Sequence, residues 1–242
     1  MGSCDNILWV LSTYSNLFTL YSGSDSGSDK AIEPSINNAV EAYKKYYVNR
    51  DYEQVDLWRL LRNRFGISQV IYPGSYIQIS PSFIFPCVIY VDSDKNAIRF
   101  FQSDALIDMV NQRKEYSERP EIVFHGVDYG NLIEAYQSKF DLLISQYAGF
   151  ISEVCKPYLR TGGYLLVNNS HGDAGMASID RDYKLVSAVH KTKGEYSLSN
   201  SSLADYFIPK KEITVTKELL LERSKGVGYT KTAPLYLFQK IA

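Results

Sequence analysis

Short apolar runs alternate with amphipathic stretches along most of the chain. Five runs have the β-branched and aromatic character of buried strands, at residues 67–72, 88–91, 121–125, 141–145 and 164–168. The other stretches repeat apolar residues at helical spacing, which predicts helices at 34–48, about 51–65, 94–102, 104–115, 132–140 and 150–159. Two further strands are expected at 183–189 and 233–240. This alternation predicts an α/β fold built on a mostly parallel sheet.

Local signals predict where several of these elements begin and end. Asp51 is the expected cap of the second helix, and Gly66 is expected to end it. Between the first two strands, Ser80 followed by Pro81 predicts a helical turn instead of a full helix. Asp94 is the expected cap of the helix that follows the second strand.

An acid follows the second strand, and its spacing from a glycine earlier in the chain is informative. Asp92 follows the run 88–91 and lies eighteen positions after Gly74, in the loop that follows the first strand. Nucleotide-binding α/β folds place a carboxylate for the ribose hydroxyls at about this interval. The spacing therefore predicts a site for an adenosine-like cofactor at the carboxyl ends of the strands. The competing interpretation is that Asp92 caps the next helix.

Composition narrows the classes of partner. The chain has 242 residues, 45% hydrophobic content and a net charge of −1, which predicts one domain over residues 31–242 and no global attraction to nucleic acid or anionic membranes. The three cysteines are widely spaced, which favours a reducing cytoplasm over a disulfide framework. Tyrosines are interleaved with Lys44 and Lys45. Surfaces that stack on nucleic-acid bases have this pattern, but an ordinary amphipathic helix is the more frequent explanation.

The first thirty residues are expected to be an N-terminal segment and a flexible linker. The apolar run 7–21 is interrupted by polar residues and is too short and polar to span a bilayer. Asp5 stands where a signal peptide carries positive charge, so we expect a packing segment instead of a targeting signal. Residues 22–29 contain only Ser, Gly and Asp, the composition of a flexible linker, although an exposed loop has the same composition.

Four segments of the chain follow one another in a familiar order. They are the loop segment 70–75, the strand and acid at 88–92, the segment 124–128, and the strand 140–145 followed by the glycine-containing run 159–167. Together they resemble a class I S-adenosylmethionine-dependent methyltransferase, over roughly residues 50–170 plus the closing strand near 235–240. The resemblance implies S-adenosylmethionine as cofactor. It also implies a Rossmann-like, doubly wound sheet with helices on both faces, here with an N-terminal helical extension.

The resemblance implies two groups of site residues. Those expected at the cofactor are Tyr72, Gly74, Ser75, Asp92, Ser93, Val127, Asp128, Ser145 and Gln146. Those expected to act on the acceptor are Tyr147, Asn169 and His171. His171 and Asp173 are candidates for a general base with its orienting partner, or for metal ligands, although an ordinary polar turn explains them too. No metal site is assigned. The acceptor is unknown, with a small molecule or a protein favoured over nucleic acid.

Departures from the family pattern keep two other functions open. The first loop has one glycine, Gly74, where the family has two or three, and glycines there let the backbone approach the ligand. A methyltransferase-like domain without activity, serving as a binding or scaffold module, is therefore the main alternative. A nicotinamide-dependent oxidoreductase is a weaker one, because the chain lacks the Gly-x-Gly-x-x-Gly fingerprint.

Overall fold

The computed structural model describes residues 17–19, 33–131, 133–223 and 225–242. Contacts divide the chain into two compact units. Unit 1 comprises residues 1–69 and 75–128, and unit 2 comprises residues 70–74 and 129–242. The predictions for the N-terminal segment and linker lie outside the described residues, apart from residues 17–19. A single domain over 31–242 stays a prediction.

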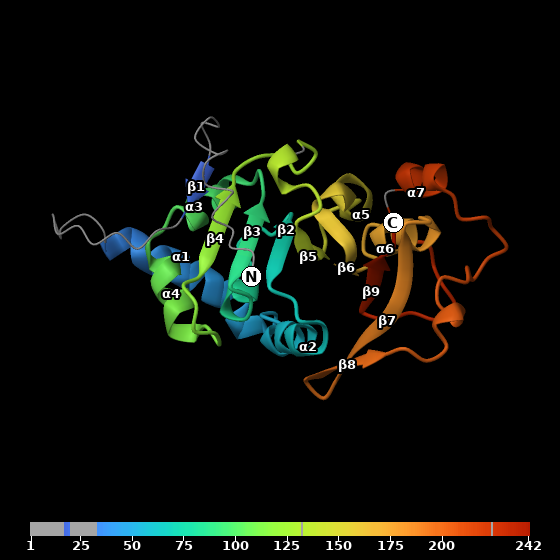
Figure 1. The fold of residues 1–242 in the computed structure, drawn as a ribbon, viewed down its shortest axis with the longest axis horizontal. Coiled ribbons are helices and arrows are strands. Elements are labelled where there is room, and N and C mark those ends of the chain that lie inside the picture. The colour runs from blue at the N-terminus through green and yellow to red at the C-terminus, as the bar shows by residue number, and fades with distance from the viewer. Residues whose placement is uncertain (1–16, 20–32, 132, 224) are drawn as a thin grey trace. The chain divides into compact units, whose positions relative to one another are not determined.

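Unit 1 combines three strands with helices (Figure 1). Its strands are β1 (Leu17–Thr19), β3 (Cys87–Val91) and β4 (Glu121–His125). Its helices are α1 (Glu33–Tyr46), α2 (Val55–Phe65), α3 (Lys95–Phe101) and α4 (Ala105–Arg113), with 3-10 turns at Val48–Arg50 and Ser80–Phe83. β3 pairs in parallel with β4, and β1 pairs with the other edge of β4 in the antiparallel sense.

Aromatic side chains hold the helices of unit 1 to its strands. Phe101 of α3 stacks on Phe124 of β4 with ring centroids 4.4 Å apart, and its ring also lies 4.9 Å from that of Tyr90. Tyr43 of α1 is fully buried and meets Phe83 edge-on. Such contacts add to the free energy of burying large apolar rings. Through Tyr43, one face of α1 is part of the core of unit 1.

Unit 2 contains three parallel strands followed by three antiparallel strands. β2 is assigned to Gln69–Pro73, and from residue 70 onward it belongs to this unit. The other strands are β5 (Phe140–Ser145), β6 (Leu159–Val167), β7 (Tyr183–Thr192), β8 (Glu195–Ser199) and β9 (Leu235–Lys240). The helices are α5 (Ile151–Val154), α6 (Asp173–Ile179) and α7 (Lys217–Arg223), with 3-10 turns at Glu134–Tyr136, Lys156–Tyr158 and Leu203–Asp205.

The strand order of unit 2 is β2-β5-β6-β9-β7-β8. β5 pairs in parallel with β2 on one side and with β6 on the other. The closing strand β9 lies antiparallel between β6 and β7, and β8 forms a hairpin with β7. The predicted fold class, a Rossmann-like α/β fold with mostly parallel strands in its core, is confirmed. The predicted closing strand near 235–240 is confirmed as well.

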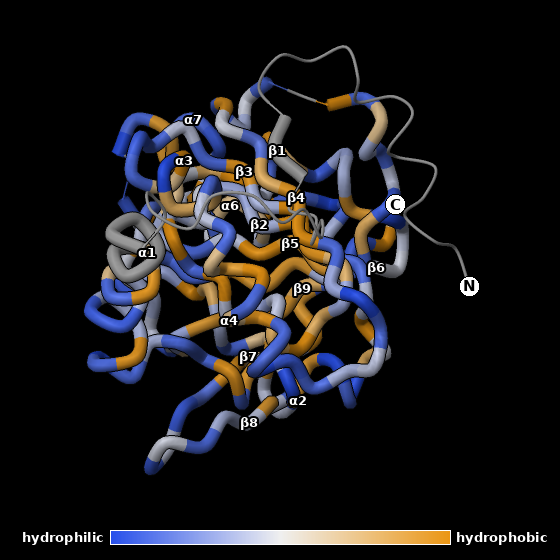
Figure 2. Tube along the Cα trace, turned by 90° about the vertical axis from the view of Figure 1, so that its left-hand side faces the viewer, coloured by the Kyte–Doolittle hydropathy of each residue, from blue (hydrophilic) through white to orange (hydrophobic). Residues whose placement is uncertain are grey.

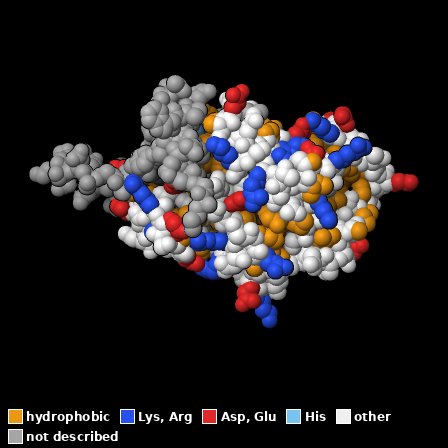
Figure 3. Space-filling view, in the orientation of Figure 1, with side chains coloured by type: hydrophobic (Ala, Val, Ile, Leu, Met, Phe, Trp, Pro, Cys, Tyr) orange, Lys and Arg blue, Asp and Glu red, His pale blue; other side chains and the backbone are white. Residues whose placement is uncertain are grey.

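Hydropathy follows this architecture. Figure 2 shows hydrophobic residues gathered along strands such as β5 and β9, and hydrophilic residues at the tip of the β7–β8 hairpin. On the face turned to the viewer in Figure 3, basic and acidic side chains are interspersed. No helix in the described part of the chain combines the length and the apolar character that a membrane crossing requires.

Several boundaries differ from the sequence prediction. Asp51 does not cap α2: it adopts a left-handed conformation after a 3-10 turn, and Gln54 precedes the helix without a side-chain cap. The predicted helix 132–140 is reduced to a 3-10 turn at Glu134–Tyr136. The predicted helix 150–159 divides into α5 and a 3-10 turn that carries Pro157, since proline cannot continue the helical hydrogen bonding. The elements α6, α7 and β8 were not predicted.

Candidate functional site

In unit 1, Asp92 is fixed in a turn at the carboxyl end of β3. Its Oδ2 accepts a hydrogen bond from the backbone N–H of Tyr76 at 2.7 Å, and its Oδ1 accepts one from the N–H of Asp94 at 2.8 Å. The side chain is partly exposed. An ionised carboxylate has about four acceptor positions on its two oxygens, so each oxygen retains capacity for a further donor.

The residues around Asp92 have separate structural tasks. Asp94 caps α3, as predicted, by accepting from the N–H groups of Asn96 at 2.7 Å and Ala97 at 3.2 Å. Tyr76 has a φ of 49°, in a region uncommon for residues other than glycine, and its N–H to Asp92 helps to hold it there. Asp92 is thus not the cap of α3, since its bonds fix the loop 75–77 and the chain entering the helix.

The other predicted cofactor residues of unit 1 differ in exposure. Ser75 is 2% exposed, whereas Ser93 and Asp128 lie at the surface and Val127 is half-buried. His125, which ends β4, is buried, and burial lowers its pKa to about 4. His125 is therefore neutral at physiological pH.

In unit 2, the glycine of the first loop packs against another backbone segment. Gly74 has a φ of 64°, and a Cβ atom built on it would lie 2.1 Å from the Cβ of Ala148. This glycine is required both for the turn and for the close approach of residue 148. Tyr72, just before this loop, is 4% exposed.

A buried polar cluster occupies the carboxyl end of β5. Ser145, which is 2% exposed, donates its hydroxyl hydrogen bond to Oδ2 of Asp173 at the start of α6. Ser152 donates to the same carboxylate through its backbone N–H at 3.1 Å and through its hydroxyl. Burial raises the pKa of Asp173 to about 6, although these hydrogen bonds oppose the shift. We name Ser145, Ser152 and Asp173 the aspartate–serine cluster.

The predicted pairing of His171 with Asp173 is wrong. Asp173 points into the aspartate–serine cluster, whereas His171 is exposed and its Nδ1 lies 3.0 Å from the hydroxyl of Ser170. The two-residue spacing places them at the start of α6, where one side chain turns inward and the other faces solvent. Among the described residues, no group of three or more His, Cys, Asp or Glu is arranged to hold a metal ion.

The predicted acceptor residues lie on two neighbouring loops of unit 2. Tyr147 is 72% exposed and has a φ of 61°. Asn168, at the end of β6, accepts hydrogen bonds from Ser170 and a long one, 3.5 Å, from the N–H of Tyr147. The Nδ2 of Asn168 is buried without a hydrogen-bond partner among the described residues, a costly state for a donor.

Asn169 and Gln146 are held more firmly than Tyr147. Asn169 accepts from the N–H of Gly175 at 3.0 Å, and a Cβ on Gly226 would lie 2.4 Å from the Asn169 carbonyl oxygen. Gln146 is 6% exposed. Unit 2 therefore brings Tyr147 and the 168–171 loop together, but it assigns the Asn169 side-chain oxygen to α6. The sequence analysis missed Ser152, which belongs to no recognisable motif.

Comparison with known proteins gives structural similarities alone. No family model matches the chain, and no curated protein matches it. The O-methyltransferase TomG of Streptomyces achromogenes, solved with S-adenosylmethionine and involved in tomaymycin synthesis, is 11% identical over 89% of this chain and 92% of its own, with a TM-score of 0.47. An O-methyltransferase of Bacillus cereus, solved with S-adenosylhomocysteine, is 12% identical over 71% of this chain and 89% of its own, with a TM-score of 0.46. A methyltransferase of Geobacter sulfurreducens is 13% identical over 81% of this chain and 97% of its own, with a TM-score of 0.42.

Proposed function

We propose that the chain is a methyltransferase that uses S-adenosylmethionine. The observation that carries the proposal is Asp92: a partly exposed carboxylate at the carboxyl end of a parallel strand, with both oxygens oriented by backbone N–H groups. A carboxylate held in this way can accept from the two hydroxyls of a ribose without having to reorganise. The sequence predicted this role from the spacing to Gly74.

The residues of the chain would contribute positioning more than acid–base chemistry. When bound, S-adenosylmethionine would supply an electrophilic methyl group, which would bond to the acceptor atom in line as its bond to the sulfonium sulfur breaks and S-adenosylhomocysteine leaves. In unit 1, Asp92 would hold the ribose of the cofactor. In unit 2, exposed Tyr147 and His171 are the residues proposed to act on the acceptor. Holding two reactants in the right orientation is a large part of the rate enhancement of such reactions. A general base is needed only if the acceptor must lose a proton first.

The acceptor proposed here is a small molecule or a protein. Exposed Tyr147 offers an aromatic surface that suits an organic acceptor. Basic and acidic residues balance in the whole sequence, which gives little attraction for the phosphates of nucleic acid.

An inactive binding or scaffold module is the second candidate, and two features of unit 2 favour it. The open side of Gly74 is filled by Ala148, and Ser145 donates its hydroxyl to Asp173. These two predicted cofactor residues therefore already have structural partners. A cofactor in this chain would have to be held mainly by other residues.

Titration calorimetry with S-adenosylmethionine and S-adenosylhomocysteine tests the proposal. We expect micromolar binding, on the order of −8 kcal/mol, by the unmodified chain. Asp92→Ala should weaken binding by about tenfold or more, as expected when a charge-assisted hydrogen bond is lost. Asp108→Ala, which removes an exposed acid on α4, is the matched control and should bind normally.

Two outcomes would contradict the methyltransferase. One is the absence of binding at millimolar ligand by a folded chain, which would leave the scaffold module as the better candidate. The other is equal binding by Asp92→Ala and the unmodified chain. Thermal unfolding of each variant shows whether the fold is retained.

A further inference from the structure

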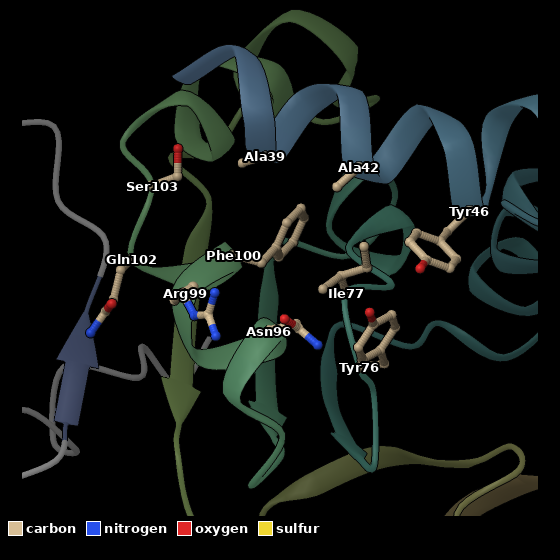
Figure 4. Close-up of a pocket in the computed structure, with 10 residues that line it drawn as sticks. All are labelled: Ala39, Ala42, Tyr46, Tyr76, Ile77, Asn96, Arg99, Phe100, Gln102 and Ser103. Atoms are coloured by element: carbon tan, nitrogen blue, oxygen red, sulfur yellow. The ribbon is translucent and has the colours of Figure 1, made fainter. Parts of the chain in front are cut away.

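Unit 1 contains a pocket that does not include Asp92. Its volume is about 540 Å³, within the range of small-molecule sites. Figure 4 shows α1 along one side and α3 along the other, with Tyr76 and Ile77 closing one end. The lining residues are Ala39, Ala42, Tyr46, Tyr76, Ile77, Asn96, Arg99, Phe100, Gln102 and Ser103.

One end of this pocket is aromatic. Tyr46 of α1 and Tyr76 face each other there with ring centroids 5.7 Å apart and planes at 86° (Figure 4). Phe100 rises from α3 toward α1, and Ala42 supplies a small side chain on the helix above it (Figure 4). Aromatic walls with small aliphatic neighbours fit a planar organic ring, which can stack on one face and meet ring edges on the other.

The other end of the pocket is polar and positively charged. Arg99 is exposed on the last turn of α3, and none of the described acidic side chains forms an ion pair with it. In the same unit, Arg59 and Arg113 are paired with glutamates. The hydroxyl of Ser103, which lies at the same end in Figure 4, is buried and has no hydrogen-bond partner among the described residues.

The surrounding charges reinforce this polarity. Lys45 and Arg50 lie over the ring of Tyr46, with the Lys45 ammonium 5.9 Å and the Arg50 guanidinium 5.5 Å from its centroid. Two acids lie near Tyr76. The carboxylate of Asp94 accepts from two N–H groups of α3, and that of Asp92 accepts from the N–H groups of Tyr76 and Asp94. Among the described residues that line the pocket, Arg99 carries the only charge, which favours an anionic ligand.

We propose that this pocket binds a small aromatic carboxylate. The carboxylate pairs with the Arg99 guanidinium, while the ring packs against Phe100 and the Tyr46–Tyr76 pair. A guanidinium suits this task because its planar fork matches a carboxylate. The inference goes beyond the proposed function, since it requires neither the cofactor nor methyl transfer.

Calorimetry with 4-hydroxybenzoate as the probe tests the inference, with 4-hydroxybenzamide as its neutral counterpart of similar shape. We expect millimolar or tighter binding of the carboxylate and at least about tenfold weaker binding of the amide. Arg99→Gln should weaken carboxylate binding by about tenfold while leaving the weak amide binding unchanged. Arg64→Gln, at an exposed arginine on α2 outside the pocket, is the matched control and should bind normally.

A second variant locates the binding. Ala42→Leu keeps a good helix former on α1 but fills the pocket, so it should abolish binding of the probe. The inference is overturned if no carboxylate binds at millimolar concentration, if the acid and the amide bind equally, or if Arg99→Gln or Ala42→Leu binds as the unmodified chain does. These results do not depend on S-adenosylmethionine, so this failure is distinguishable from failure of the methyltransferase.

Discussion

Each unit of the molecule places one aspartate near the carboxyl end of a parallel strand, and the two aspartates differ in nearly every physical respect. Asp92 in unit 1 is partly exposed and is held by backbone N–H groups. Asp173 in unit 2 is 2% exposed and is held mainly by Ser145 and Ser152. The first retains acceptor capacity toward solvent, and the second is enclosed by its own donors.

This difference separates a binding carboxylate from a structural one. In both cases the sequence offers an acid in a polar segment that follows an apolar strand. Burial raises the pKa of Asp173 to about 6, while its donors are all contributed by the same unit. We infer that Asp173 holds α5 and α6 against the end of β5, and that Asp92 is the better candidate for contact with a ligand.

The largest expected effect is the loss of the buried carboxyl group. Asp173→Ala leaves the hydroxyls of Ser145 and Ser152 and the N–H of Ser152 without their acceptor in a site closed to water. Since each stranded donor costs about 1–3 kcal/mol, we expect a total loss of about 3 kcal/mol in the free energy of unfolding. Urea denaturation near pH 5 measures it. Asp108→Ala on α4 is the exposed control, and an equally small effect of both variants would remove the distinction between the two aspartates.

The pH dependence of stability tests the same contrast between Asp92 and Asp173. The pKa of Asp173 is raised from 3.8 to about 6 by folding, so the folded state binds its proton more tightly than the unfolded state. The stabilisation is therefore fully present below pH 3.8 and is lost as the pH rises through about 6. Between about pH 4 and about pH 8, the stability of the unmodified chain relative to Asp173→Asn should fall by about 2 kcal/mol.

Urea unfolding of both chains across this range measures the difference, in which the other titrating groups cancel. A difference that rises with pH would mean that the carboxylate is stabilised by its neighbours more than it is penalised by burial. That result would remove the burial penalty that sets Asp173 apart, and the contrast between the two aspartates would fail.

Much of the fold was predictable because its signals are local. The buried strands β3 and β5 are continuous apolar runs, and Gly66 ends α2 in the expected left-handed conformation. Asp94 caps α3 because the acceptor and the N–H groups that it bonds lie within three residues. Such interactions are encoded in a few neighbouring positions, so a single sequence suffices to find them.

The site was less predictable because its decisive contacts join distant residues. The bond from Ser145 to Asp173 spans 28 positions, and the bond from Ser152 to Asp173 spans 21. Nothing in the polar segment 168–173 indicates which side chain turns inward and which stays in solvent. The Asp51 prediction failed for another reason: Gln54 adopts the left-handed conformation before α2, so the helix begins without a side-chain cap.

The smallest expected effect concerns the stability contribution of Asp92. Asp92→Ala removes the acceptors of the Tyr76 and Asp94 N–H groups, but the turn is partly exposed and water can replace the lost partner. We therefore expect a loss of about 1 kcal/mol in the free energy of unfolding, roughly a third of the effect of Asp173→Ala. Urea denaturation at one pH measures both variants. Asp92→Asn, which keeps one acceptor oxygen, should fall between Asp92→Ala and the unmodified chain. If Asp92→Ala instead destabilises the chain as much as Asp173→Ala does, then the main role of Asp92 is to hold the loop at Tyr76. The exposure of its carboxylate would then no longer favour ribose binding.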